Sequence, residues 1–234
     1  MKKERNTFMT PQSAVSTRIK AEGEKNLILH THFPTLIGVA INPDHQTLEN
    51  KLTKKCLKLR KKIKSGGQDW ISNQTYNTLG TYHLSEDPDF SNINDFVTNQ
   101  VIHYCKAQSI NLNCLNINPV EAWLSIYKKN NYQDWHIHNP AMISASYYLR
   151  CNKSSAKIYF QNPVTDILSP DILSYNKLNF GQIWFQPEPG MLVIFRSHLY
   201  HCVAQQKNND LRISLSYNYE RKFEKGKKRS NRLS

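Results

Sequence analysis

Two histidines stand one residue apart in the stretch "NNYQDWHIHNPAMISASYYL" at 130–149, where His136 and His138 flank Ile137. An alternating apolar and aromatic run follows them, which is typical of a β-strand. Residues two apart on a strand point to the same face, so both imidazoles can reach one ligand. The pair indicates either a metal site or two solvated histidines, since histidine is a common metal ligand.

A third histidine and an arginine favour the metal site over two solvated histidines. His201 follows the apolar run "MLVIF" at 191–195, and Arg212 opens the alternating stretch "RISLSYNYE" at 212–220, in which it shares a face with Ser214. A guanidinium that lines a barrel interior needs an anion, and a carboxylate is its bidentate partner. Imidazole ligands without thiolates suit iron, zinc, copper or nickel. These residue types predict a metal site with a carboxylate-bearing cosubstrate.

The predicted secondary structure that positions these residues changes from helices to β-strands near residue 119. Apolar residues recur at three- and four-residue spacing in 48–63 and 93–104, which predicts two helices, the second capped by Asn92 or Asn94. Period-two alternation then fills "VEAWLSIYKK", "AMISASYYLRC", "AKIYFQNP", "GQIWFQPEPGMLVIF" and "LRISLSYNYE". Several strands with Pro, Gly and Asn between them predict an antiparallel barrel or double-sheet jelly roll. We expect both helices on the outer face of its sheet.

The net charge of +13 is concentrated in two segments. Residues 51–64 hold 8 of the 31 basic residues and residues 221–233 hold 7. Such segments can attract a polyanion such as nucleic acid through its phosphates. A solvated helix face and a disordered tail are the simpler interpretation, because no aromatic residues interleave with the lysines of the helix.

Targeting and cysteine usage favour a cytoplasmic protein. The apolar runs "LIGVAI" and "MLVIF" fall far short of the ~20 residues of a membrane helix, and the N-terminus lacks the apolar region of a secretory signal. The 5 cysteines are odd in number and form no C-x-x-C pair, so neither a disulfide framework nor a thiolate zinc site is predicted. We expect no membrane association and a reducing compartment.

The ordered set of motifs resembles the iron(II)- and 2-oxoglutarate-dependent dioxygenases, in particular a prolyl-hydroxylase-like oxygenase group of marine phages and bacteria. The resemblance covers roughly residues 30–220, and the order of the motifs is more specific than any one of them. The matching pieces are "FPTLI" at 33–37, Trp123, "HIHNP" at 136–140, "SASYYL" at 144–149, "PEPGMLVIFRSHLYH" at 187–201 and "RISLSYN" at 212–218.

This resemblance implies a mainly β fold with flanking helices, a double-stranded β-helix of the jelly-roll, cupin-like type. It implies that His136 opens a metal site for Fe(II) and His201 closes it. Arg212 would bind the distal carboxylate of 2-oxoglutarate with Ser214 beside it, and Tyr127 would be a second anchor. Tyr147, Tyr148, Trp123 and Trp184 are expected in the core, and Trp135 as a pocket wall.

The chain departs from the wider superfamily at one metal position. That superfamily has H-x-D or H-x-E, which gives two histidines and one carboxylate, whereas this chain has His138 there. H-x-H is usual in the subgroup, so His138 is expected as a third neutral ligand, with Asp134 as the alternative. His30 and His32 repeat the H-x-H spacing without the surrounding motifs, which shows that the spacing alone identifies nothing.

The expected function is an Fe(II)- and 2-oxoglutarate-dependent dioxygenase, a hydroxylase that consumes O2 and acts on an unidentified small molecule, protein or nucleic acid. One rival is a three-histidine, cupin-like metalloprotein that does not use 2-oxoglutarate. The other is a non-enzymatic polyanion-binding protein. A cytoplasmic location is expected, in the bacterial host if the gene belongs to a phage.

The expected organisation is one domain between two terminal segments. Residues 1–29 are a predicted flexible lead-in, residues 30–220 a single double-stranded β-helix with two N-terminal supporting helices, and residues 221–234 a basic tail. Substrate specificity in such a fold lies in loops, here 161–182.

Overall fold

The computed structural model describes residues 17–20, 28–31, 33–66, 75–164, 171–176 and 178–222. The chain divides into two compact units, 1–36 and 37–234. In the first, β1 (Thr17–Lys20) and β2 (Ile28–Thr31) form an antiparallel pair, in and just beyond the predicted flexible lead-in. The rest of that lead-in, and the basic tail from residue 223 onward, lie outside the described residues.

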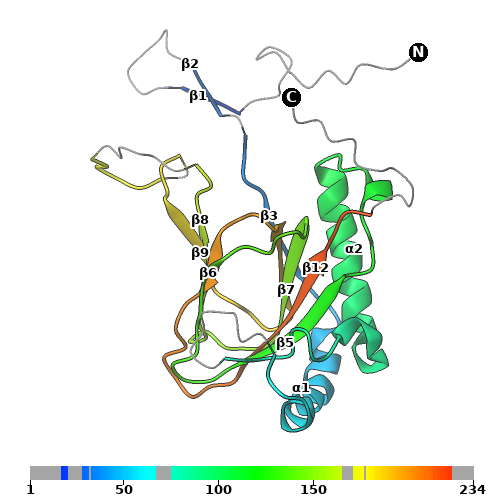
Figure 1. The fold of residues 1–234 in the computed structure, drawn as a ribbon. Helices are drawn as coiled ribbons and strands as arrows, with labels where there is room; N and C mark the ends of the chain where they lie inside the picture. The colour runs from blue at the N-terminus through cyan, green and yellow to red at the C-terminus, as the bar shows by residue number, and fades with distance from the viewer. Residues whose placement is uncertain are drawn as a thin grey trace, which may run out of the picture. The chain divides into compact units, whose positions relative to one another are not determined.

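The larger unit is built from two antiparallel sheets, as the alternating segments predicted (Figure 1). The six strands of the larger sheet are, in spatial order, β3 (Ile37–Ile41), β10 (Met191–Arg196), β7 (Ile143–Arg150), β12 (Arg212–Tyr219), β5 (Glu121–Tyr127) and β4 (Tyr76–Asn77). The smaller sheet has β6 (Gln133–His136), β11 (His201–Val203), β8 (Ile158–Gln161) and β9 (Gln182–Phe185). Apart from β4–β5 and β8–β9, strands that are neighbours in these sheets are not consecutive in the chain, which is typical of a jelly roll.

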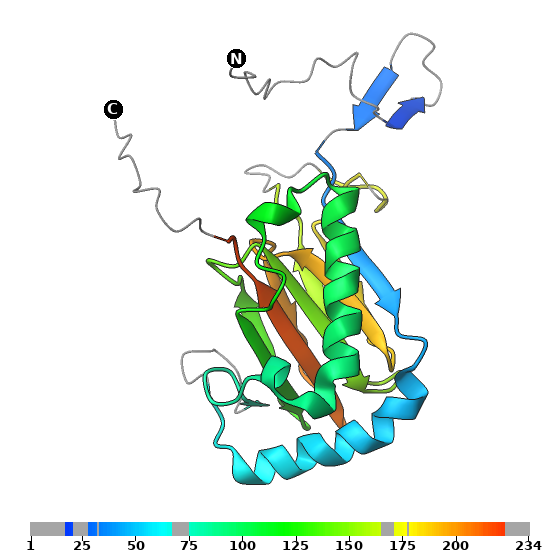
Figure 2. The ribbon, with the colours of Figure 1, turned by 90° about the vertical axis from the view of Figure 1, so that its right-hand side faces the viewer.

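Two long helices lie against the larger sheet in the same unit (Figure 2). They are α1 (His45–Lys62) and α2 (Ser91–Ala107), and the short helices are η1 (Leu84–Glu86), η2 (Pro88–Phe90) and η3 (Leu112–Cys114). The predicted asparagine cap of α2 is wrong, because Phe90 is the capping residue and the Asn94 amide donates to the carbonyl oxygen of Leu84. Of the helices in the described ranges, none has the length and apolar character to cross a membrane.

One face of β12 packs in the core with the two long helices, and its other face lines the interior of the barrel. Its apolar side chains belong to the core cluster that also holds the buried faces of both helices: Ile213, Leu215, Tyr217 and Tyr219. Its remaining side chains line an interior cavity: Arg212, Ser214, Ser216 and Asn218. Alternation along one strand therefore places apolar residues under the helices and polar residues inside the barrel, as predicted.

Candidate active site

Three histidines form a cluster at the smaller sheet. His136 ends β6 and pairs with His201 at the start of β11, and His138 lies two residues beyond β6. One potential ligand atom from each side chain lies within 4.8 Å of those of the other two. The ring centroids of His136 and His201 are 4.2 Å apart, and that of His138 is 4.9 and 5.0 Å from them. Small ring rotations could bring all three onto one ion, since metal–nitrogen bonds are about 2 Å long.

Hydrogen bonds determine which nitrogen two of these rings present. Nδ1 of His136 lies 2.7 Å from the carbonyl oxygen of Asp134, and Nδ1 of His201 lies 2.8 Å from that of Leu199. A carbonyl oxygen can only accept, so each Nδ1 carries the proton and donates it. Nε2 of each ring is then the nitrogen with a lone pair for a ligand. Backbone partners of this kind orient the histidines of metal sites.

Burial keeps the three rings neutral at physiological pH. Desolvation, reinforced by neighbouring His136, lowers the pKa of His138 to about 3. Desolvation also lowers the pKa of His136, and it lowers that of His201 well below its ordinary value together with the two neighbouring histidines. Neutral imidazole is the form that binds a metal, so this cluster needs no deprotonation to do so.

Asp134, the alternative to His138, is not part of the cluster. Its Oδ1 accepts a hydrogen bond from the backbone N–H of Trp135 at 2.7 Å, and its carbonyl oxygen holds the His136 ring. The donor set that the structure brings together is therefore three neutral imidazoles. A site with two histidines and one carboxylate would carry one more negative charge.

Arg212 is buried to 1% exposure and lines the same cavity as the histidines. Its Nε donates to the carbonyl oxygen of Ala156 at 3.2 Å, and its Nη1 lies 3.5 Å from Oγ of Ser214. No carboxylate of the described residues forms an ion pair with it. Burying a charge without a counter-ion is costly, so this end of the cavity suits an anionic ligand.

Two tyrosines contact the Arg212 guanidinium. Its carbon lies 4.3 Å from the ring centroid of Tyr127 and 5.2 Å from that of Tyr148. Burial raises the pKa of Tyr127, and it raises that of Tyr148 to about 12, so both phenols keep their protons and can donate. Among the described residues, the buried Tyr148 hydroxyl has no partner at hydrogen-bonding geometry. Within the described part of the chain, a donor without an acceptor thus lies beside a cation without a carboxylate partner, and this pair again fits an anion.

Tyr148 is a buried core residue, as predicted together with Tyr147, but sequence reasoning did not place its ring beside Arg212. The two tyrosines point to opposite sides of β7. Tyr147 packs in the core under the helices, and Tyr148 lies among the side chains inside the barrel. The missed signal was parity, because Tyr148 lies two and four residues after Ser146 and Ser144, and both of these serines line the cavity.

Two tryptophans also differ from expectation. Trp184 is half exposed, with the Lys157 ammonium 3.3 Å from its ring centroid, so it is not a core residue. Trp135 stacks on Tyr200 at 5.5 Å and does not line the cavity, because it alternates with His136 along β6. Trp123 is buried as predicted, and its ring also contacts that of His138 at 5.6 Å. In the predicted specificity loop 161–182, residues 165–170 and 177 lie outside the described residues.

The cavity has two chemically different regions. The three histidines could hold a metal in one, and Arg212 with Tyr127 and Ser214 could hold a carboxylate in the other, with the Tyr148 ring packed beside the guanidinium. Ser125, Ser146 and Ser216 line it as well, so its wall is polar. This donor set fits a metal together with a small dicarboxylate. Fold and site define a jelly-roll metalloprotein of this kind.

Comparison with known protein families identifies the class of metalloprotein that this fold and site indicate. Residues 121–218 match the family model described as "Putative 2OG-Fe(II) oxygenase", and this segment contains every residue of the candidate site. Over this segment the predicted resemblance to the Fe(II)- and 2-oxoglutarate-dependent oxygenases is confirmed, whereas the match does not address the marine phage and bacterial subgroup. The chain is thus an oxidoreductase of the class whose cofactors are Fe(II) and 2-oxoglutarate. A search of curated protein sequences finds no match.

Solved structures share the fold at low sequence identity. A prolyl-4-hydroxylase from Pseudomonas putida is 13% identical with a TM-score of 0.58, over 81% of this chain and 94% of that one. A prolyl hydroxylase from Trichoplax adhaerens, in complex with a peptide fragment of hypoxia inducible factor, is 13% identical with a TM-score of 0.55, over 79% and 83%. HygX from Streptomyces hygroscopicus, with nickel and 2-oxoglutarate bound, is 11% identical with a TM-score of 0.53, over 81% and 84%. The predicted double-stranded β-helix is confirmed.

Proposed function

We propose that this chain is a hydroxylase in which His136, His138 and His201 hold Fe(II), and Arg212, Tyr127 and Ser214 hold 2-oxoglutarate. The observation that carries the proposal is one cavity lined both by three neutral imidazoles and by a buried arginine without a carboxylate partner among the described residues. With both groups bound, Fe(II) supplies the site at which O2 oxidises 2-oxoglutarate to succinate and CO2 and a substrate C–H bond becomes C–OH.

The protein's own residues bind and orient the cosubstrate in this proposal. Arg212 neutralises the distal carboxylate through charge-assisted hydrogen bonds, which are stronger than neutral ones. Tyr127, Tyr148 and Ser214 donate further hydrogen bonds to it, because burial keeps the two phenols protonated. Apolar side chains such as Ile158 and Phe195 line the cavity as well and limit the entry of water.

His138 gives the iron site a neutral ligand in place of a carboxylate. Three imidazoles leave the site with one negative charge fewer than two imidazoles and a carboxylate, which changes the electrostatic environment of the metal. The acidic cosubstrate then supplies the negative charge of the assembled centre. Binding of Fe(II) is therefore expected to strengthen when 2-oxoglutarate is present, a coupling that works equally in both directions.

The test is anaerobic titration of the folded, metal-free protein with Fe(II) and 2-oxoglutarate. A chelated complex gives a metal-to-ligand charge-transfer absorption, which is expected only when both are present. His201→Ala should abolish it, because one of three ligands is lost. Wild-type protein that is folded but develops no such absorption would refute the proposal.

Arg212 also argues against a three-histidine metalloprotein that does not use 2-oxoglutarate. That rival has no anion for a guanidinium buried to 1% exposure. It predicts that Arg212→Ala leaves the affinity for 2-oxoglutarate unchanged, whereas a cosubstrate site loses that affinity.

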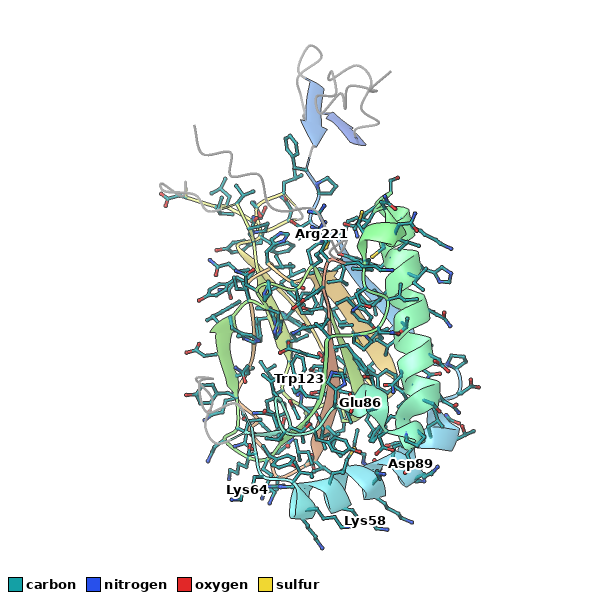
Figure 3. The ribbon with its side chains drawn as sticks, turned by 45° about the vertical axis from the view of Figure 1, so that its right-hand side comes forward. Lys58, Lys64, Glu86, Asp89, Trp123 and Arg221 are labelled. Carbon is teal, nitrogen blue, oxygen red and sulfur yellow. The ribbon has the colours of Figure 1, made fainter. Side chains whose placement is uncertain are left out.

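A second function is contact with nucleic acid through α1. The observation in its favour is a group of exposed lysines on the solvent side of this helix. Lys51 and Lys55 form ion pairs with Asp87 and Asp89 of the η2 region, at 2.8–2.9 Å. The remaining lysines on the solvent side of α1 are Lys54, Lys58, Lys61 and Lys62, all exposed, and Figure 3 shows Lys58 at the outer edge of the helix. Lysines at three- and four-residue spacing repel each other by a few tenths of a kcal/mol per pair, so they do not stabilise the helix.

Nucleic acid fits this face better than a membrane, because the apolar side of α1 is already buried in the core through Leu52, Cys56 and Leu59. Fluorescence anisotropy with a labelled DNA duplex at several salt concentrations tests it. A triple change of Lys54, Lys58 and Lys61 to Gln should make the salt slope shallower by about 2.7, since each phosphate contact contributes about 0.9. His136→Ala should bind as wild type does. An unchanged slope in the triple variant would exclude α1 as the contact.

For the primary substrate we propose only a chemical class. The cavity wall carries Ser125, Ser146 and Ser216, so a polar substrate fits it better than an apolar one. Membership of the marine phage and bacterial subgroup and a cytoplasmic location stay predictions from the sequence.

A further inference from the structure

His138 is the one histidine of the cluster that no strand positions. His136 and His201 face each other across the β6–β11 ladder, whereas His138 lies in the connection between β6 and β7. Its backbone N–H donates to the carbonyl oxygen of Ser197 at 2.9 Å, in the turn after β10. The position of its imidazole therefore depends on what holds that turn.

Besides a backbone hydrogen bond from the Ser197 N–H to the carbonyl oxygen of Met142 at 3.1 Å, a chain of side-chain hydrogen bonds holds this turn, buried apart from its exposed end at Glu121. Oγ of Ser144 donates to Oδ1 of Asn218 at 2.8 Å, and Nδ2 of Asn218 donates to Oε2 of Glu121 at 2.7 Å. Oγ of Ser144 also lies 2.8 Å from Oγ of Ser197. Because the single Ser144 proton is given to Asn218, Ser197 must be the donor in that pair. The chain therefore runs in one direction from Ser197 through Ser144 to Asn218.

This network links four elements around the cavity. Glu121 belongs to β5, Asn218 to β12, Ser144 to β7, and Ser197 to the turn after β10. Ser144, Ser197 and Asn218 are each exposed by 2% or less, and their hydrogen bonds satisfy one another. The register of the larger sheet brings Asn218 directly opposite Ser144. The larger sheet thus fixes the turn that holds the backbone of His138.

A role in stability alone does not explain these residue types. Buried polar side chains add little net stability over apolar ones of similar shape, but a fully connected network specifies one geometry. Here the specified geometry is that of a potential metal ligand lying outside the strands. The ring of Trp123 contacts the His138 ring at 5.6 Å and gives it a packing surface.

We infer that Ser144, Ser197 and Asn218 are positioning residues for His138, which keep its imidazole in the cluster with His136 and His201. The inference rests on the proposed metal site. Loss of the network should leave the other two histidines in place and weaken only the third ligand. Loss of a group that hydrogen-bonds a metal ligand directly typically lowers metal affinity 10- to 100-fold, and this range sets the scale of the loss expected here, where Ser144 acts on His138 through Ser197.

The test uses Ser144→Ala, with Ser144→Thr as the conservative variant that keeps the hydroxyl and Ser216→Ala as the matched control on the cavity wall. Co(II) is the probe, because its visible absorption reports its ligands as well as its affinity. Ser144→Ala should bind Co(II) 10- to 100-fold more weakly than wild type, with a spectrum shifted toward that of His138→Ala. Ser144→Thr and Ser216→Ala should resemble wild type.

A double variant separates positioning from a general structural effect. If Ser144 acts through His138, Ser144→Ala should cause no further loss of Co(II) affinity in a His138→Ala background. An equal loss in both backgrounds would overturn the inference, as would wild-type affinity in the single variant.

Hydrogen exchange in the metal-free protein provides a readout independent of the metal site. The His138 amide should exchange faster in Ser144→Ala than in wild type, because its acceptor turn is released, while amides of β12 should be unchanged. Unchanged exchange at His138 would overturn the inference. Wild-type protein that binds no Co(II) while these exchange rates behave as expected would instead refute the proposed metal site.

Discussion

Arg212→Met tests the cosubstrate site most directly, because it removes the charge and keeps much of the side-chain volume. Arg212 is buried, has no carboxylate partner among the described residues, and touches the rings of Tyr127 and Tyr148. Truncating one partner of a buried, hydrogen-bonded charge pair costs about 2–5 kcal/mol. Since about 1.4 kcal/mol is a factor of ten, 2-oxoglutarate should bind roughly 30-fold to several-thousand-fold more weakly.

The stability of the ligand-free protein should respond very differently. The variant loses the hydrogen bond to the Ala156 carbonyl oxygen and the contacts with two aromatic rings. It also removes a buried charge for which the described residues supply no counter-ion, which offsets those losses. We expect the free energy of unfolding to change by less than about 1 kcal/mol, within the spread of measured effects for replacing buried charges.

The assay is anaerobic calorimetry of 2-oxoglutarate binding to the Fe(II)-loaded protein, with urea unfolding of the ligand-free protein alongside. Arg150→Met is the matched control, because Arg150 faces Ile213 in the neighbouring strand but forms an exposed ion pair with Glu49 at 3.0 Å. The control should keep wild-type affinity. A 2-oxoglutarate Kd for Arg212→Met within about threefold of wild type, less than 1 kcal/mol, would refute the reasoning.

Three further outcomes follow from the site. Tyr148→Phe should weaken 2-oxoglutarate binding, measured by calorimetry, by roughly 2- to 10-fold. It should raise the free energy of unfolding of the ligand-free protein, measured by urea unfolding, by about 1 kcal/mol, because it removes a buried hydroxyl that has no partner among the described residues. Ser214→Ala should weaken 2-oxoglutarate binding by roughly 10-fold or more in the same assay, because it removes one hydrogen bond to a charged carboxylate, worth about 1.5–3 kcal/mol, and an unchanged Kd would exclude its role. The metal-free protein should lose stability as the pH falls below 6.5. His138 should contribute about 1 kcal/mol of this loss between pH 6.5 and 5.5, because its pKa is lowered to about 3 in the folded state and the unfolded state therefore binds more protons in this range. Urea unfolding at the two pH values tests this, and equal stabilities would contradict it.

Local pattern made much of the site predictable from the sequence. Alternation along residues 212–220 placed Arg212 and Ser214 together on one face, and the structure has both inside the barrel. The apolar spacing of 48–63 and 93–104 predicted α1 and α2, because a helix that buries one face must repeat its apolar residues at that spacing. The ordered motifs predicted a resemblance to the oxygenases, and the oxygenase family model matches residues 121–218.

Register and long-range contact decided the rest. Tyr147 and Tyr148 are alike in sequence, and only the packing of β7 between the helices and the barrel interior determines which one reaches Arg212. Asp134 and His138 both had the parity of a metal ligand, but the cluster contains only His138.

The hydrogen-bond chain from Glu121 to Ser197 joins residues up to 97 positions apart in sequence. No local pattern predicts such a chain, because its geometry exists only after β12 has paired with β7. The sequence by itself determined which side chains are available to bind a metal and a carboxylate, since alternation and composition are local properties. The tertiary structure decided which of those side chains meet, since that depends on the pairing of strands far apart in the chain.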